Sequence, residues 1–460
     1  MSFSTIRLPF GVAFLLAGLG LFAASSSGQP LDPAQPLDPA QPLEGVDALD
    51  APAPPEQAIP EVTEAVERFQ QRDFDGALEL LKKAAAEHAD MPPAQVVMAQ
   101  LFSQANQGNA VRISLEQAVA ESPEDPEAYV IMGDIAMAQG RVTEASLLYD
   151  RAESALANFT RSPRRKSILD ARNLSGLAAV AEARGEWELA EQRLRAWQKL
   201  DPENAVCLQR LARARFQQRN PSDALKLLRE AAALDENVLT PEAQLALFYH
   251  EFGDQKNARI WMNNAIKIAP NNLRTRLVAG RWNLETNQLE DAEREAAAAT
   301  KLDSKSLDAN LFRGVVALFR KDYETAENYF QRAHLQSPGN FAASNNLALA
   351  LIEQDNDEKR RRAFEYAVTN VRQNPRATEA LSTYGWVQYR LGNIDEADRA
   401  LQQAAAAGTM SPDTAYYLAV VSAEKGRRDQ AVQLLNAALN ARQPFSQREE
   451  ARVLLRQLTR

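Results

Sequence analysis

The sequence predicts an all-α fold, a solenoid of stacked helix-turn-helix hairpins that ends in a carboxy-terminal capping helix. Three observations predict it. A block of 34 residues recurs along most of the chain, each block contains two stretches with helical apolar spacing, and small residues recur at the same two places of the block. Because a hairpin of this kind buries its apolar faces only against its neighbours, the predicted core runs along the whole array.

The clearest copy of the block runs from Leu307 to Asn340. Its first predicted helix carries Gly314, and its second carries Ala326, where the two helix backbones must approach closely. Phe330 is the large residue predicted to fill the space between hairpins. Pro338 ends the second helix, because proline lacks the backbone donor that a helix interior needs.

The alanine of the second helix recurs in register down the chain. Successive copies lie 34 residues apart, apart from one spacing of 45 and one of 37. The residues at this place are Ala77, Val111, Ala145, Ala190, Ala224, Ala258, Ala292, Ala326, Ala363, Ala397 and Ala431. These eleven copies, over residues 59–445, resemble the tetratricopeptide repeat family. The resemblance implies a right-handed solenoid in which the first helix of each hairpin lines a concave surface.

The pattern of residues 1–28 predicts a secretory signal peptide or an amino-terminal anchor. Arg7 precedes an uncharged and mostly apolar run, Leu8 to Ala24, and small residues follow at Ser25 to Gly28. At seventeen residues, the run is also close to the shortest stretch that spans a bilayer. An uncleaved segment that anchors the chain to the inner membrane therefore stays open as an alternative.

The composition of residues 29–58 predicts a disordered, acidic linker. They contain QPLDPA twice, then QPLEG, and their many prolines remove backbone donors, so no packed core is expected. Residues 1–60 carry a net charge of −5 out of the total of −9. A plain tether is the main interpretation, and a ligand for an aromatic-lined groove is the alternative.

Eleven extra residues, TRSPRRKSILD at 160–170, interrupt the array after the third copy. They either lengthen the second helix of copy three or form a projecting loop, and Pro163 favours a break near Ser162. The basic residues of this insertion could meet phosphate, an acidic lipid surface or an acidic partner, or could remain solvated. They are Arg161, Arg164, Arg165 and Lys166.

Two features are predicted near the carboxy terminus. Copy nine has three extra residues within Asp355 to Arg362, and their mixed charge predicts an exposed turn between its helices. Residues 446–460 predict the capping helix. Ser446 stands at its N-cap with Glu449 three residues later, which is the pattern of a capping box. The expected apolar face of this helix consists of Val453, Leu454 and Leu458.

The sequence contains no recognisable catalytic or metal-binding pattern. His88, His250 and His334 fall in three different copies, and the lone Cys207 lies among apolar residues. No zinc-protease, phosphate-loop or nucleophile-elbow motif occurs. We therefore expect no enzymatic activity, no cofactor and no metal. A pI of 5.2 without a basic stripe argues against nucleic-acid binding.

Helical spacing selects the side chains of each first helix that point to the concave side. These side chains are basic in the middle copies and mostly apolar or aromatic in the later ones, which suits an extended or helical peptide. The predicted protein-binding residues are Arg213, Arg274, Arg281, Leu311, Val315, Leu318, Phe319, Asn345, Leu349, Trp386 and Tyr389. No lysine falls at the mapped positions, so the lysine clamp of some family members is not expected. The competing interpretation is that the apolar members pack against neighbouring hairpins.

Three functions follow from this pattern. The leading one is a non-catalytic scaffold of a bacterial cell envelope, exported by its signal, that binds a protein or peptide partner in the concave groove. The second is a subunit of an envelope polysaccharide-export or secretion assembly, which long periplasmic arrays of the family resemble. The third, an enzyme-associated repeat protein, is remote because no segment outside the repeats is long enough for a catalytic domain. The expected location is the periplasm or cell envelope.

Overall fold

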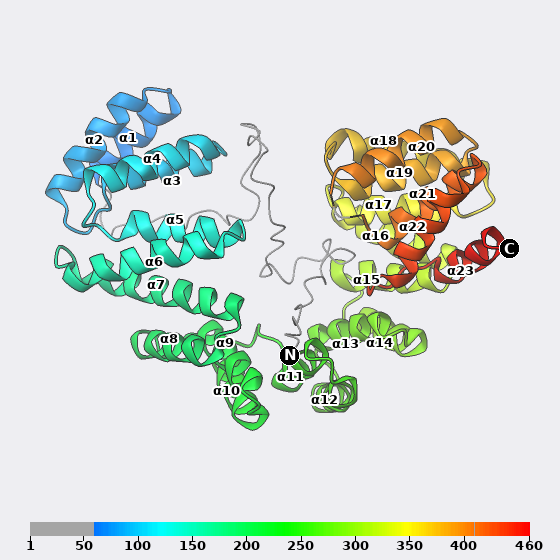
Figure 1. The fold of residues 1–460 in the computed structure, drawn as a ribbon, viewed down its shortest axis with the longest axis horizontal. Helices are drawn as coiled ribbons and strands as arrows, with labels where there is room; N and C mark the ends of the chain where they lie inside the picture. The colour runs from blue at the N-terminus through cyan, green and yellow to red at the C-terminus, as the bar shows by residue number, and fades with distance from the viewer. Residues whose placement is uncertain (1–58, 409) are drawn as a thin grey trace, which may run out of the picture. The chain divides into compact units, whose positions relative to one another are not determined.

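The computed structural model describes residues 59–408 and 410–460, which form 23 helices and no strand (Figure 1). The predicted signal peptide of residues 1–28 and the linker of residues 29–58 lie outside the described residues. Helices α1 to α22 follow one another as eleven pairs, and α23 (Arg448–Leu458) comes last. The predicted all-α solenoid of paired helices is therefore confirmed.

The first helix of each pair is called the A-helix and the second the B-helix. The A-helices are α1 (Pro60–Gln70), α3 (Ala94–Gln104), α5 (Glu127–Ala138), α7 (Pro163–Arg184), α9 (Ala205–Gln217), α11 (Pro241–Glu251), α13 (Leu273–Glu285), α15 (Leu307–Phe319), α17 (Phe341–Ile352), α19 (Thr378–Arg390) and α21 (Pro412–Glu424). The B-helices are α2 (Phe74–Glu87), α4 (Gly108–Glu121), α6 (Val142–Asn158), α8 (Trp187–Leu200), α10 (Pro221–Leu234), α12 (Gln255–Ile268), α14 (Leu289–Leu302), α16 (Tyr323–Gln336), α18 (Asp357–Gln373), α20 (Ile394–Ala406) and α22 (Arg428–Asn440).

Contacts group the described helices into two compact units. One unit ends at Ala258 and the other comprises Arg259–Arg460, with the division inside α12. In the second unit, one continuous apolar core reaches from Leu277 to Ala451 and includes residues of every hairpin that it crosses. This is the arrangement expected of stacked repeats, in which each hairpin completes the core of its neighbour.

Neighbouring A-helices lie closer together than neighbouring B-helices. The pairs α5 and α7, α13 and α15, α15 and α17, α17 and α19, and α19 and α21 are in direct contact. Within the described residues, no two B-helices make comparable contact. The A side of the stack is therefore the tighter side, as expected of the concave side of a curved solenoid.

A residue with a positive φ angle follows the end of almost every A-helix. At this place the chain must reverse direction, and a positive φ lets the helix end and turn within a few residues. The residue is glycine in five hairpins but arginine, asparagine or lysine in five others, at φ between 55° and 65° in the latter. The positions are Arg72, Asn106, Gly140, Gly185, Arg219, Gly253, Asn287, Lys321, Gly392 and Gly426.

Phe330 was expected to fill the space between hairpins, and the structure places its ring against Gly314 within its own hairpin. A Cβ built on Gly314 would lie 2.5 Å from the ring of Phe330, which is fully buried, so a larger residue here would force that ring to move. Tyr149 plays the same part in copy three, where its ring fills the space that Gly133 and Gly176 leave open. The aromatic side chain thus packs directly against a bare stretch of helix backbone.

The insertion at 160–170 does not form a projecting loop. The second helix of copy three, α6, is longer than most B-helices but ends at Asn158, and most of the insertion starts the A-helix of copy four early. The expected break near Ser162 is confirmed, because α7 begins at Pro163 with Ser162 as its N-cap. Three of the insertion's four basic side chains bond within the protein. Arg161 donates to the carbonyl oxygen of Ala85, and Lys166 to that of Leu156.

Arg165, from the same insertion, is buried in an ion-paired cluster. Its Nη2 lies 3.0 Å from the carboxylate of Asp125 and 2.6 Å from that of Glu127. Burial raises the pKa of the Glu127 carboxyl, and the adjacent guanidinium opposes that shift. The insertion therefore ties copies one, three and four together, and its arginines are not a free anion-binding loop.

Two predictions near the carboxy terminus are wrong. The extra residues of copy nine do not form a turn but lengthen α18, where Lys359 and Arg362 pair with Glu327 of copy eight. The capping box of the last helix does not form either. Its N-cap is Gln447 rather than Ser446, and no side chain caps it.

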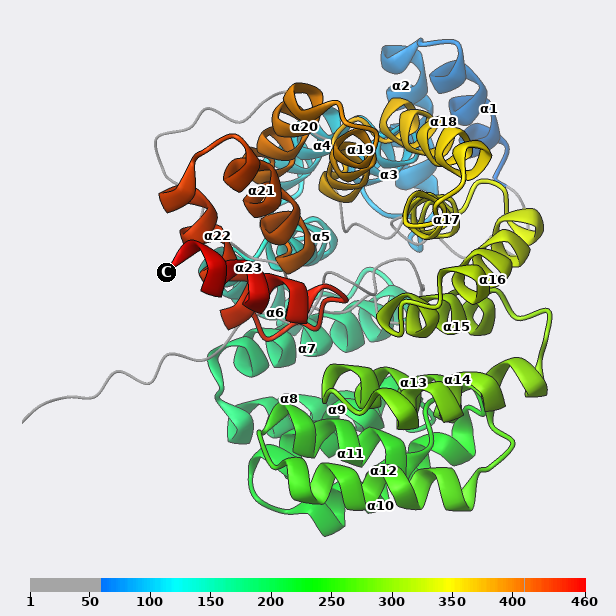
Figure 2. The ribbon, with the colours of Figure 1, turned by 90° about the vertical axis from the view of Figure 1, so that its right-hand side faces the viewer.

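The last helix also differs from the prediction in its apolar face. Val453 is 44% exposed, whereas Ala451 is fully buried and Leu454, Leu455 and Leu458 pack against the core. Figure 2 shows α23 lying along α22. None of the described helices is long and apolar enough to cross a membrane.

Candidate partner-binding face

The A-helices α13, α15, α17 and α19 carry ten of the eleven predicted binding residues. Five apolar or aromatic ones are half-buried and pack against the core of the second unit while keeping part of their surface outside. They are Val315, Leu318, Phe319, Leu349 and Tyr389. We call these five residues the apolar row. The structure places them on three successive A-helices, each of which contacts the next.

Three other predicted binding residues lie deeper. Leu311 is 1% exposed, Trp386 is 5% exposed and Asn345 is 7% exposed. These side chains offer little surface of their own to a partner. The side-chain amide of Asn345 was expected to contact the backbone of a partner. Its oxygen is buried and accepts no hydrogen bond within the described residues.

Trp386 is held by a stack and a hydrogen bond. Its ring lies 4.3 Å from that of Tyr417 and 5.2 Å from that of Tyr389, with interplanar angles of 16° and 26°. Its Nε1 donates to Glu353 at 2.7 Å, and Arg390 pairs with the same carboxylate. Burial raises the pKa of Tyr389 to about 12, so this phenol stays protonated at neutral pH. The aromatic end of the face is therefore rigid.

The three predicted arginines have different surroundings. Arg213 is exposed and pairs with Glu251 at 2.8 Å, which neutralises it locally. Arg274 is half-buried on α13. Arg281, two turns further along the same helix, is only 9% exposed, and its Nε and Nη2 donate to no acceptor. The structure thus brings Arg274 and Arg281 together with the apolar row in one unit, while Arg213 belongs to the other.

Helical spacing did not reveal two features of this region. The first is the position of α23, whose Glu450 pairs with Lys321 in the turn between α15 and α16, 129 residues away in the chain. No local pattern signals such a contact. The second is Asp413 in the first turn of α21. Its Oδ2 is buried without a hydrogen-bond partner, and burial raises its pKa to about 7.

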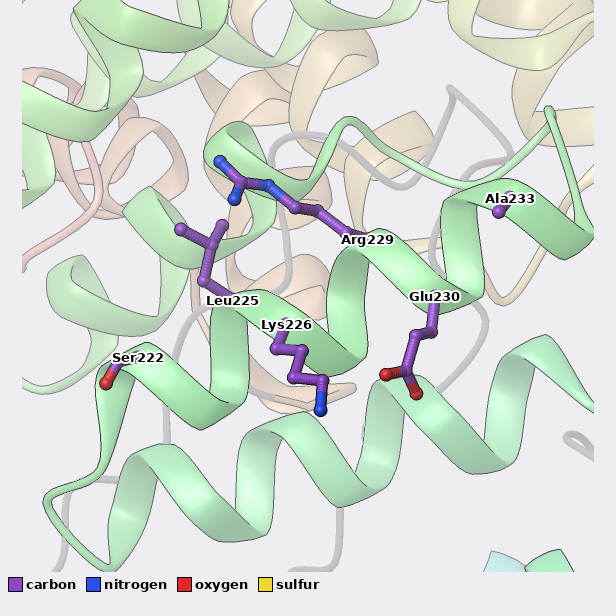
Figure 3. Close-up of a pocket in the computed structure, with 6 residues that line it drawn as sticks. All are labelled: Ser222, Leu225, Lys226, Arg229, Glu230 and Ala233. Carbon is purple, nitrogen blue, oxygen red and sulfur yellow. The ribbon is translucent and has the colours of Figure 1, made fainter.

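The described residues contain no group of His, Cys, Asp and Glu side chains that could hold a metal ion. Cys207 is buried, and burial raises the pKa of its thiol to about 11, so it is not a reactive thiolate at neutral pH. An open depression lies on one side of α10, where Leu225, Lys226 and Arg229 line it along a single helix (Figure 3).

Comparisons with known proteins agree on one repeat family. The family model described as "Tetratricopeptide repeat" matches residues 98–159, 210–272, 279–340 and 384–446, together more than half of the chain. No curated protein matches the chain.

Several solved structures are similar to the chain. Yeast Tom70 is 13% identical over 87% of this chain and 95% of its own, with a TM-score of 0.37. A tetratricopeptide repeat protein of Thermus thermophilus is 19% identical over 41% of this chain and 99% of its own, with a TM-score of 0.36. For pilF of Pseudomonas aeruginosa the identity is 19%, over 43% of this chain and 88% of its own, with a TM-score of 0.33.

Proposed function

The chain belongs to the tetratricopeptide repeat family, and from this premise we propose that it is a non-catalytic scaffold that binds a segment of a partner protein along α13, α15, α17 and α19. The apolar row is the observation that carries the proposal. Its five side chains lie on consecutive A-helices and are only half covered. A partner that covers them gains about 25 cal/mol for each Å² of apolar surface removed from water.

The charged side chains of the same helices add a polarity to the proposed face. Arg274 and Arg281 lie on α13, the first helix of the proposed face. The rigid aromatic stack lies on α19, its last helix. A bound segment would therefore place apolar side chains over the row and an acidic side chain towards α13. Such a segment is recognised by side chains of several repeats at once, which is how repeat scaffolds obtain specificity.

We further propose that the scaffold is exported and works in the periplasm or cell envelope. The support is the signal-like pattern of residues 1–28, in which one arginine, an apolar run and small residues follow one another. An uncleaved form of this segment would associate with the membrane. A role in an envelope polysaccharide-export or secretion assembly is the narrower version of the same proposal.

A photo-reactive residue placed at Leu318 tests the proposed face in cells. Leu335 is the matched control, because it is on α16 of the same copy and is 72% exposed. We expect one protein to crosslink through Leu318 and not through Leu335, since α16 is a B-helix. Fractionation of the same cells shows whether the crosslinked product is soluble in the periplasm or stays with membranes.

The outcomes separate the possibilities. A crosslink to a synthase or pore component in the membrane fraction would support the assembly subunit. Equal capture through Leu318 and Leu335 would show that the A-helices have no special role. No capture through Leu318 would mean that the apolar row serves internal packing, and the proposed binding face would have to be given up.

A further inference from the structure

The last helix reaches back from copy eleven to copy eight within the unit formed by Arg259–Arg460. Glu450, in the first turn of α23, pairs with Lys321 in the turn between α15 and α16. The helix also packs on α22, the B-helix of copy eleven. Because the copies stack in order, a helix that contacts copies eight and eleven must pass copies nine and ten. Both views of the ribbon place the start of α23 beside α15 (Figures 1 and 2).

The loop before α23 contacts the aromatic end of the candidate face. The ring of Phe445 is buried and lies 6.3 Å from that of Tyr416 on α21. Tyr416 lies 6.1 Å from Trp386, which stacks on Tyr389 of the apolar row. Phe445 therefore anchors the loop at α19 and α21, three residues before α23 begins.

The contact with copy eight places α23 at the other end of the apolar row. Lys321 stands two residues after Phe319, the last residue of α15. The first turn of α23 therefore lies between the two ends of the row, and it restricts access to the last turns of the A-helices. Four of the five row members lie in those turns, namely Leu318, Phe319, Leu349 and Tyr389.

Few interactions hold α23 in this position. Ala451 is its one buried residue, whereas α15 buries seven. No side chain caps its N-terminus. The side chains of Lys321 and Glu450 are 45% and 38% exposed, so water and salt screen their attraction. Such a helix separates from the array more readily than a hairpin of the core does.

We propose that α23 is a displaceable ligand of the chain's own partner-binding face, and that the partner segment is an amphipathic helix that replaces it. The inference rests on the proposed function, because it takes the apolar row as the binding face. The partner helix carries an acidic side chain that pairs with Lys321 and apolar side chains four, five and eight residues later. These spacings put the apolar side chains on one side of a helix. In α23 the corresponding residues are Glu450, Leu454, Leu455 and Leu458.

Release of α23 sets how strongly a partner binds. The loop of residues 441–447 tethers α23, so the helix acts at an effective concentration on the order of millimolar although its contacts are few. The apparent affinity of a partner is proportional to the fraction of molecules in which α23 is released. A change that weakens only the contact with Lys321 is therefore expected to strengthen partner binding.

A fluorescent peptide of residues 446–460, titrated onto the full-length chain, tests this displacement. In a Glu450→Lys chain, the tethered helix meets Lys321 with a like charge, whereas the added peptide keeps its glutamate. We expect this chain to bind the peptide about fivefold more tightly than the unaltered chain, which is the effect of one exposed ion pair. Higher salt is expected to reduce the difference.

Matched variants separate the ion pair from a general effect of charge. Glu449→Lys makes the same change in the same turn, but Glu449 pairs with Arg452 within α23, so the peptide affinity is expected to stay unchanged. Adding Lys321→Glu to the Glu450→Lys chain restores an ion pair within the chain and repels the peptide's glutamate. The affinity is then expected to return to that of the unaltered chain or below it. A merely structural role of α23 would not follow the sign of these charges.

A locked chain distinguishes this inference from the proposed function. A short bismaleimide linker between Lys321→Cys and Glu450→Cys holds α23 on copy eight, while the native Cys207 is buried. The locked chain is expected to bind the peptide about tenfold or more weakly than the same chain treated with a monofunctional maleimide, since its helix cannot leave.

Equal peptide affinity of the locked, Glu450→Lys and unaltered chains would overturn the inference, whatever the crosslinking through Leu318 shows. Equal capture of a partner through Leu318 by the locked and unlocked chains would also overturn it, yet leave the binding face standing. The expected peptide affinities without any capture through Leu318 would support α23 as a displaceable ligand and count against the proposed partner scaffold.

Discussion

Arg165→Ala is expected to lower the free energy of unfolding of the unit that ends at Ala258 by about 3–5 kcal/mol. Arg165 is 7% exposed at its side chain, and its partners Asp125 and Glu127 are 6% and 12% exposed. Truncation leaves two buried carboxylates 40 and 38 residues upstream without their cation. It also removes the ion pairs through which the N-terminal part of α7 contacts Asp125 and Glu127.

Urea unfolding, followed by helical circular dichroism, measures this loss. Arg164→Ala is the control, since Arg164 is exposed in the same turn of α7 and its loss should change stability by no more than about 0.5 kcal/mol. Replacing all three partners, with Arg165→Met, Asp125→Asn and Glu127→Gln, should recover much of the loss, because no uncompensated charge remains. Equal midpoints for the Arg164 and Arg165 variants would contradict the structural role of the insertion.

Asp413→Asn is expected to stabilise the unit formed by Arg259–Arg460 at pH 8 by as much as about 4 kcal/mol. Burial raises the pKa of the Asp413 carboxyl from 3.8 to about 7, and its Oδ2 has no partner. Between pH 3.8 and 7 the folded protein holds a proton that the unfolded chain releases. Stability therefore falls as the pH rises through this window, and the loss is complete above pH 7.

The measurement is the unfolding free energy of wild type and variant between pH 5 and pH 8. The difference between the two should grow with pH and level off above about pH 7. Asp429→Asn, an exposed change on α22, is the control and should show no such growth. A constant difference between wild type and Asp413→Asn across the range would show that this carboxyl is not buried in the folded protein.

The fold could be predicted from the sequence because each hairpin repeats one local contact. Gly314 and Ala326 show why: small residues return at the same two places of each hairpin, and the 34-residue spacing makes this repetition visible in the sequence. The insertion at 160–170 was harder, because its structure depends on partners far along the chain. Asp125 and the carbonyl oxygen of Ala85 hold it, and neither lies in its local pattern.

The candidate face was only partly predictable for a related reason. Helical spacing selects which side of an A-helix faces inward, but contacts with neighbouring helices, which the spacing does not show, decide how deeply each side chain is buried. Leu311 and Trp386 are therefore inside, whereas Leu318 and Tyr389 keep an outer surface. At the carboxy terminus, the capping box at Ser446 was overridden by packing of α23 on α22.

Hydrogen–deuterium exchange tests the proposed binding face most directly. The chain would be compared free and bound to the protein that crosslinks through Leu318. We predict slower exchange in the A-helices α13, α15, α17 and α19 and unchanged exchange in the B-helices α14, α16, α18 and α20. Protection confined to the B-helices, or only to helices before Ala258, would contradict a partner bound along the apolar row.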